Sequence, residues 1–75
     1  MNKSRRQWLA NVISQLEEKR DELWSIYEDE EQAYDNLPEG IQESERGETM
    51  QDNMGIIEDA YNDLDNLISN LNELI

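Results

Sequence analysis

The chain has 75 residues, with 19 acidic and 6 basic side chains, a formal net charge of −13, and no cysteine or histidine. This composition excludes disulfide bonds, Cys/His zinc sites and catalysis that depends on cysteine or histidine. A chain this short buries a modest core, so a second copy is the remaining source of extra buried surface.

The charge is distributed unevenly along the chain. Residues 1–20 carry five basic and two acidic side chains, whereas residues 21–75 carry 17 acidic side chains and only one basic one, Arg46. An acidic surface repels nucleic acid and anionic membranes and attracts basic protein surfaces. No apolar run approaches the ~20 residues of a membrane span, and none follows the basic N-terminus as a secretory signal requires. We therefore expect a cytoplasmic protein with no direct nucleic-acid or membrane binding.

The first predicted element is a helix over about residues 4–36, with Ser4 as its N-cap. Its apolar side chains repeat every seven residues and form a stripe broad enough for a bundle helix, flanked by Trp8 and Trp24. The a positions are Leu9, Leu16, Leu23, Glu30 and Leu37, the d positions are Val12, Lys19, Ile26 and Ala33, and the e positions are Ile13, Arg20, Tyr27 and Tyr34.

Two basic residues, Lys19 and Arg20, interrupt this stripe in mid-helix. One interpretation is local ion pairing with the neighbouring acids, such as Asp21 and Glu22, while the basic stems cover the core. The other is a polar layer that sets register or partner choice, as polar residues do inside coiled coils.

The stretch from Asp35 to Glu48 predicts the turn, at about residues 37–44. Pro38 cannot continue a helix that arrives from the N-terminus. Gly40 can adopt the positive φ that a reversal requires, and the Ser44 hydroxyl can cap the first turn of a second helix.

The second predicted helix covers about residues 45–75. Gly47 and Gly55 each lower its propensity by about 1 kcal/mol relative to alanine, so residues 46–55 are expected to be its loosest part. The a positions are Met50, Ile57, Leu64 and Leu71, the d positions are Asn53, Ala60, Leu67 and Leu74, and the e positions are Met54, Tyr61, Ile68 and Ile75.

These elements predict an all-α fold, an antiparallel αα-hairpin that forms a single domain over residues 1–75. Two helices with such broad stripes cannot hide both stripes in each other, so we expect two hairpins to form a four-helix bundle. The expected dimer core consists of Leu9, Val12, Ile13, Leu16, Leu23, Ile26, Tyr27, Ile57, Tyr61, Leu64, Leu67, Ile68 and Leu71.

Enzymatic chemistry finds little support in the acidic clusters. Glu17, Glu18 and Asp21 match the magnesium motif of the all-α nucleotide pyrophosphatases only loosely, and the second motif of those enzymes is missing. Asp63 and Asp65 lack the glycine and terminal glutamate of a calcium loop. We therefore expect no enzyme, no metal and no cofactor.

The turn carries a resemblance to a known group of proteins. Its sequence, DNLPEGIQESERGE, is similar to the turn between two acidic helices in uncharacterised small helical proteins of phages and prophage-rich Gram-positive bacteria. The resemblance implies a hairpin and a phage context, hence the cytoplasm of a host cell, and it implies no activity. The matching residues are Asp35, Asn36, Pro38, Glu39, Ile41, Gln42, Ser44, Glu45, Arg46 and Glu48.

Charge, size and exclusion together predict a non-enzymatic acidic protein–protein interaction module that binds a second copy of itself. The alternative is a nucleic-acid mimic that inhibits a host DNA- or RNA-binding defence protein, because carboxylates one helical turn apart lie ~5–6 Å from each other, near the spacing of phosphates. A basic partner is expected at the turn. The expected contact residues are Glu28, Asp29, Glu30, Glu31, Asp35, Glu39, Glu43, Glu45 and Glu48.

Overall fold

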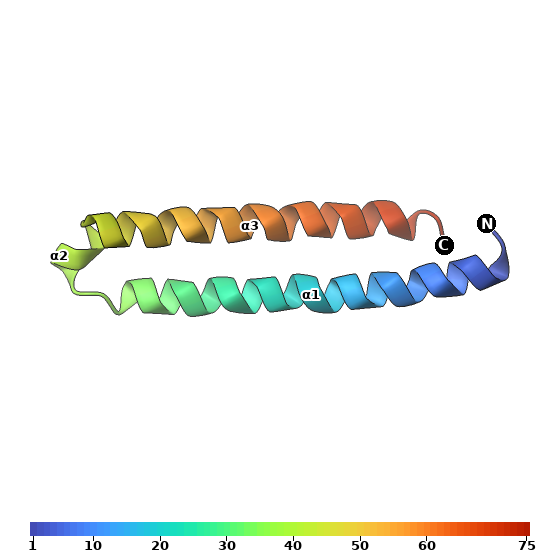
Figure 1. The fold of residues 1–75 in the computed structure, drawn as a ribbon, viewed down its shortest axis with the longest axis horizontal. Coiled ribbons are helices and arrows are strands. Elements are labelled where there is room, and N and C mark those ends of the chain that lie inside the picture. Colours follow the sequence, from blue (N-terminus) through green and yellow to red (C-terminus); the bar gives the residue numbers. More distant parts are fainter.

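A computed structural model describes all 75 residues and contains three helices, α1 (Lys3–Asp35), α2 (Glu39–Gln42) and α3 (Glu45–Asn72), and no strand. The long helices α1 and α3 lie side by side and run in opposite directions, with both termini at one end and α2 at the other (Figure 1). The molecule measures 58 × 15 × 11 Å. The predicted all-α class is confirmed. We call residues 1–16 and 69–75 the terminal end, and residues 28–57 the turn end.

The N-terminus of α1 is capped by Asn2, not by Ser4. The Asn2 Oδ1 accepts a hydrogen bond of 2.8 Å from the Arg5 backbone N–H, and Ser4 lies inside the helix. Asparagine is among the best N-cap residues because its short side chain reaches the free N–H groups of the first turn. The prediction of Ser4 as the cap is wrong by half a turn.

The chain reverses through the short helix α2, which begins after Pro38. No residue has a positive φ, so the prediction of a left-handed Gly40 is wrong, and Gly40 is an ordinary member of α2. Gln42 joins this corner to α1, since its Nε2 donates to the Tyr34 carbonyl at 3.1 Å and to the Asp35 carbonyl at 3.5 Å. Both belong to the last four carbonyls of α1, which have no partner inside the helix, and the Tyr34 carbonyl also accepts from the Leu37 backbone N–H at 3.0 Å.

The first turn of α3 packs against the corner. Ser44 holds the N-cap position, as predicted, but its hydroxyl donates back to the Ile41 carbonyl instead of accepting from the first turn. Gly47 is buried against the backbone of Gln42. Residues 46–55, expected to be the loosest part of the second helix, are helical throughout, and the helix ends at Asn72, three residues before its predicted end.

Between the long helices runs a single row of less exposed side chains, which we call the seam. Its members recur at alternating spacings of three and four residues, the spacing of a two-stranded coiled coil. The seam consists of Leu9, Ile13, Leu16, Arg20, Leu23, Tyr27, Glu30 and Tyr34 on α1, and of Gly47, Met50, Met54, Ile57, Tyr61, Leu64, Ile68 and Leu71 on α3. It therefore uses the a and e positions of the predicted stripe, and the d positions face outward.

Three contacts between the helices fix the antiparallel register. The Arg20 Nη1 lies 2.8 Å from the Asp65 Oδ1, and the ring centroids of Trp24 and Tyr61 are 5.0 Å apart. Gln51 donates to the Tyr34 hydroxyl at 3.0 Å. From one contact to the next, the residue number on α3 decreases by as much as the residue number on α1 increases. The register of the two helices is therefore constant along their length.

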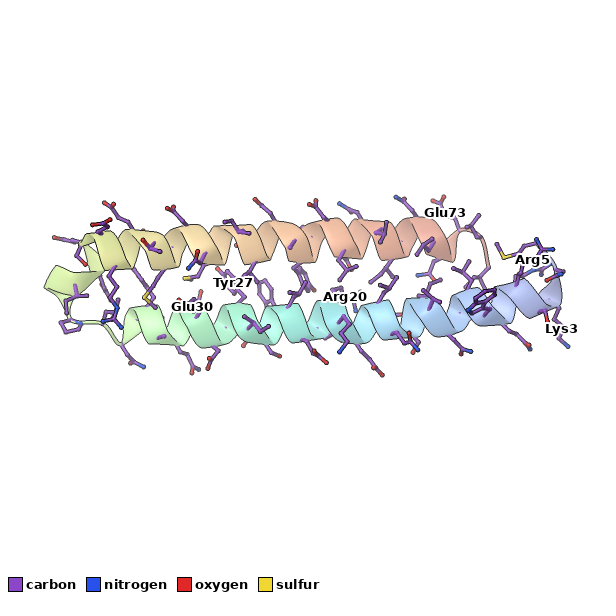
Figure 2. All side chains as sticks on the ribbon, in the orientation of Figure 1. Lys3, Arg5, Arg20, Tyr27, Glu30 and Glu73 are labelled. Carbon is purple, nitrogen blue, oxygen red and sulfur yellow. The ribbon has the colours of Figure 1, made fainter.

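Of the two basic residues in mid-helix, Lys19 follows the interpretation of local ion pairing and Arg20 follows that of a polar layer. Lys19 is exposed and pairs within its own helix with Glu22 at 3.3 Å, as local ion pairing predicts. Arg20 pairs locally with Asp21 at 3.2 Å and also reaches across the seam to Asp65 (Figure 2). These carboxylates raise the pKa of Arg20, first Asp21 and then Asp65, against the opposing effect of burial. Arg20 is therefore the polar layer, and Lys19 is not part of it.

Candidate protein-binding surfaces

One long side of the helix pair is apolar and has no cover, and we call it the apolar face. Trp8 is 72% exposed, Ile56 is 67% exposed and Leu67 is 48% exposed. Most members of the face are the d-position residues that the seam leaves outside, and Trp8 and Ile56 adjoin them. The face consists of Trp8, Val12, Ile26 and Ala33 from α1, Ile56, Ala60 and Leu67 from α3, and Leu74 after α3.

The members from both helices share one side of the molecule for a geometric reason. Both helices bury their a and e positions in the seam and run in opposite directions. An approximate two-fold rotation therefore superposes α1 on α3, and its axis is perpendicular to the plane that contains the two helix axes. Such a rotation keeps equivalent positions on the same side. The d positions therefore lie on one side, and the b positions, Trp24, Gln51 and Asp65, lie on the other side, where the three contacts across the seam are formed.

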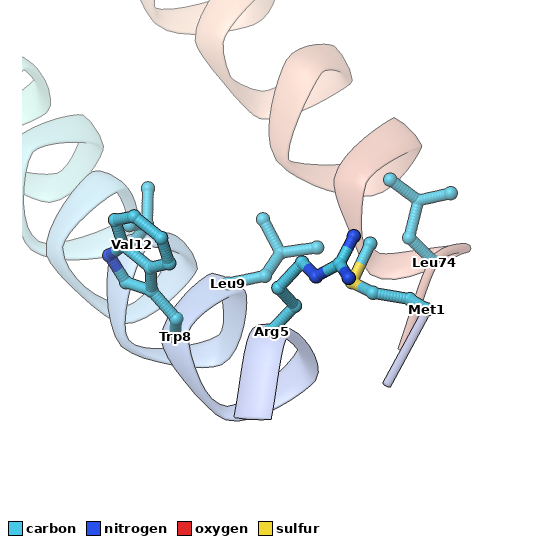
Figure 3. Close-up of a pocket in the computed structure, with 6 residues that line it drawn as sticks. All are labelled: Met1, Arg5, Trp8, Leu9, Val12 and Leu74. Atoms are coloured by element: carbon cyan, nitrogen blue, oxygen red, sulfur yellow. The ribbon is translucent and has the colours of Figure 1, made fainter. Parts of the chain in front are cut away.

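A cleft of about 300 Å³ confirms this arrangement at the terminal end of the apolar face (Figure 3). Val12 and Trp8 stand on α1 at one side of the cleft, and Leu74 comes from the other end of the chain. Five of the six lining residues are hydrophobic, and Arg5 is the one charged side chain. The lining residues are Met1, Arg5, Trp8, Leu9, Val12 and Leu74.

The opposite side of the pair carries aromatic and acidic groups. Trp24 stacks on Tyr27 with ring centroids 4.7 Å apart and also touches Tyr61. Burial raises the pKa of the Tyr27 phenol, and the negative charges of Glu58 and Glu31 raise it further. Negative charge beside a half-buried phenol favours its neutral form, so Tyr27 belongs to the packing of the seam and stays protonated at neutral pH.

The nine acidic residues expected to contact a basic partner all lie at the turn end, on the last turns of α1, on α2 and around the start of α3. Eight of them are exposed and Glu30 is half-buried in the seam (Figure 2). None of the nine forms an ion pair, because the three acids that do are Asp21, Glu22 and Asp65. Glu28 and Asp29 share a shallow polar hollow with Ser25 and Gln32.

The thirteen residues expected in the dimer core fall into two groups. Ten lie in the seam inside one chain, and only Val12, Ile26 and Leu67 lie on the apolar face. The face has further members, Trp8, Ile56 and Leu74, that the expected core left out. The sequence contains a signal for Leu74, which continues the d positions of the second helix, whereas Ile56 and Trp8 stand one position before the a sites.

Several other kinds of site are absent from the structure. No group of three or more acidic, histidine or cysteine side chains lies close enough together to hold a metal ion. None of the helices has the length and apolar character needed to cross a membrane. Comparison of the chain with protein-family models, with curated proteins and with solved structures gives no match.

Proposed function

We propose that the chain is a non-enzymatic protein–protein interaction module, an αα-hairpin that binds a second copy through the apolar face to form a four-helix bundle. One observation carries this proposal. Ile13 and Ile68 are the only apolar side chains that are buried, while ten large hydrophobic side chains remain exposed, and six of the ten lie on the apolar face. Contiguous exposed apolar surface on a soluble protein marks an interaction site.

A second copy suits this face because the face is long, lined by both helices and repeated at helical intervals. Packing two such faces against each other places the apolar d positions of four helices in one core, between the two seams, next to the polar d positions Lys19 and Asn53. This is the arrangement of a four-helix bundle, and a closed two-fold dimer uses the same surface of both partners. The dimer would bury additional apolar surface, which a chain of this size needs because its own core is small.

Sedimentation equilibrium of the wild-type chain at micromolar concentration tests the proposal. We expect about twice the chain mass of 8.9 kDa. Leu67→Glu places a charge on the apolar face and is expected to give a helical monomer or an unfolded chain. Ser69→Glu adds the same charge to an exposed site off this face and is expected to leave the dimer intact. A fully helical wild-type monomer with a sharp melting transition would contradict the proposal.

A second candidate function rests on the acids of the turn end, namely mimicry of nucleic acid towards a basic host protein, in the phage context that the turn sequence suggests. Glu31 and Asp35 lie in the last turns of α1, where the helix dipole is negative and acidic side chains are unfavourable. Helix stability therefore does not account for their presence, which supports a contact with a cationic partner at this end.

Capture of proteins from a host lysate tests this second candidate. The wild-type chain is expected to retain basic nucleic-acid-binding proteins and to release them in salt. Replacement of residues 28–31 by glutamine or asparagine removes four charges and is expected to weaken capture most at low salt. The matched control removes four acids elsewhere, Glu17, Glu18, Asp63 and Glu73. Equal loss in both variants, or capture with unchanged salt dependence, would contradict a specific role of the turn end.

A further inference from the structure

We infer that the second copy docks head to tail, with the terminal end of each chain against the turn end of its partner. The inference rests on the proposed dimer and adds its orientation. Two long apolar faces that pack with a two-fold axis have two choices, since the axis runs either along the helices or across them. An axis along the helices places the two turns together, and an axis across them places the turns at opposite ends.

The charges of the two ends decide between these choices. The turn end contains ten acidic side chains and one basic side chain, Arg46, and so carries a net charge of −9. The terminal end contains three basic side chains and one acidic side chain, Glu73, and so carries a net charge of +2 from its side chains. Docking with the turns together brings two strongly negative ends into contact. Head-to-tail docking brings each negative end against a positive one.

The basic groups at the terminal end are free for such a contact. Lys3, Arg5 and Arg6 form no ion pair within the chain. The Arg6 guanidinium donates only to the Met1 carbonyl, at 2.8 and 3.1 Å, and Arg5 lines the edge of the apolar cleft. Packed helices lie ~8–10 Å apart. This is within the Debye length of ~10 Å at 0.1 M salt, so these charges act across the interface.

The apolar side chains fit the same orientation. The terminal end has a cleft between Trp8, Val12 and Leu74, whereas Ile56, in the turn half of the molecule, projects from α3 and is 67% exposed. Ile26, also in the turn half, is 53% exposed. Head-to-tail docking brings the cleft at the terminal end of each face level with Ile56 of the second copy, with Arg5 at the rim near the partner's acids.

Distance measurement by pulsed electron paramagnetic resonance tests the inference on the full chain. The chain has no cysteine, so one introduced cysteine carries the only spin label. Gly40→Cys labels the tip of the turn, where Gly40 is exposed and a new side chain has no atom within 4 Å. Asn66→Cys is the matched control near mid-length, because its neighbour Asp65 pairs with Arg20 near the middle of α1.

Head-to-tail docking predicts a distance between the two turn labels close to the 58 Å length of the molecule, and a short distance between the mid-length labels. Two turn labels within about 30 Å of each other, set by packed helices ~8–10 Å apart, would overturn the inference and leave the dimer standing. The absence of any distance from the mid-length label, together with a monomer in sedimentation, would overturn the dimer and the orientation together.

Discussion

Two glycines of the same helix should respond in opposite ways to the same substitution. Gly55 is exposed, and a Cβ built there meets nothing within 4 Å. Gly55→Ala should therefore gain up to about 1 kcal/mol of helix propensity. At Gly47 a Cβ would overlap the Gln42 carbonyl oxygen and lie 2.8 Å from the Gln42 Cα. No side chain can move aside there, because the obstructing atoms belong to the backbone.

The magnitude for Gly47→Ala follows from two opposing terms. The same propensity gain of about 1 kcal/mol applies. Overpacking of a close contact costs about 1–3 kcal/mol, which gives a net loss of up to about 2 kcal/mol. A displaced Gln42 would also loosen its hydrogen bond to the Tyr34 carbonyl and so disturb the end of α1.

Thermal unfolding followed by circular dichroism measures both variants, at one protein concentration because dimerisation makes the transition depend on concentration. In a chain of this size 1 kcal/mol shifts the melting temperature by about 4–8 °C. We expect Gly55→Ala to melt above the wild type and Gly47→Ala below it. If the two variants melt at the same temperature, the close approach of the corner to α3 does not exist in solution.

Three further predictions concern the seam. Burial and nearby acids raise the pKa of Tyr27 above its ordinary value of 10.0, so the stability gained from its neutral phenol is complete below pH 10 and is lost as the pH rises through the raised value. The melting temperature of the wild type should therefore fall more at alkaline pH than that of Tyr27→Phe. An equal fall in the wild type and the variant would contradict this prediction. Leu64→Ala should cost about 2–3 kcal/mol in urea unfolding, the low end for leucine because the side chain is half-buried, whereas the exposed control Asn66→Ala should cost little. Arg20→Met should keep or raise the melting temperature and reduce its dependence on salt, because Asp21 and Asp65 are 69% and 50% exposed and stay hydrated when the charge between them is removed. A large loss of stability would show that the ion pair itself holds the helices together.

Much of the fold follows from the sequence because helix and turn signals act locally. The seven-residue repeat identifies every apolar seam residue between Leu9 and Leu71, and Pro38 locates the reversal. The repeat does not say which part of a broad stripe a partner helix covers. Both the d edge and the e edge of the stripe are apolar. In the structure the a and e positions, which include Arg20 and Glu30, face the partner helix, and the d positions Val12, Ile26 and Leu67 remain outside.

The misassigned details at the turn have a different origin. The sequence predicts a special backbone conformation at Gly40 and only a loss of helix propensity at Gly47, whereas in the structure Gly47 is the glycine that a close contact requires. The contact of Gly47 with Gln42 depends on how α2 folds back onto α3. Sequence shows which residues tolerate a given backbone conformation, but it does not show which pieces of backbone come close together.

The seam is one side chain deep from end to end, and this determines which insertions and deletions in the sequence the helix pair can accommodate. Across the pair the extents are only 15 and 11 Å, so each layer of the seam depends on the layers next to it. Seven residues added to both helices at the same level would lengthen the pair by ~10.5 Å at 1.5 Å per residue, and seven removed would shorten it by as much. The spacing of the seam and the geometry of the turn would both be kept. The same seven residues inserted in one helix alone would leave every layer on one side of the insertion facing the wrong partner. The reach between the two ends is therefore a property that paired insertions can adjust in steps, without any new packing arrangement.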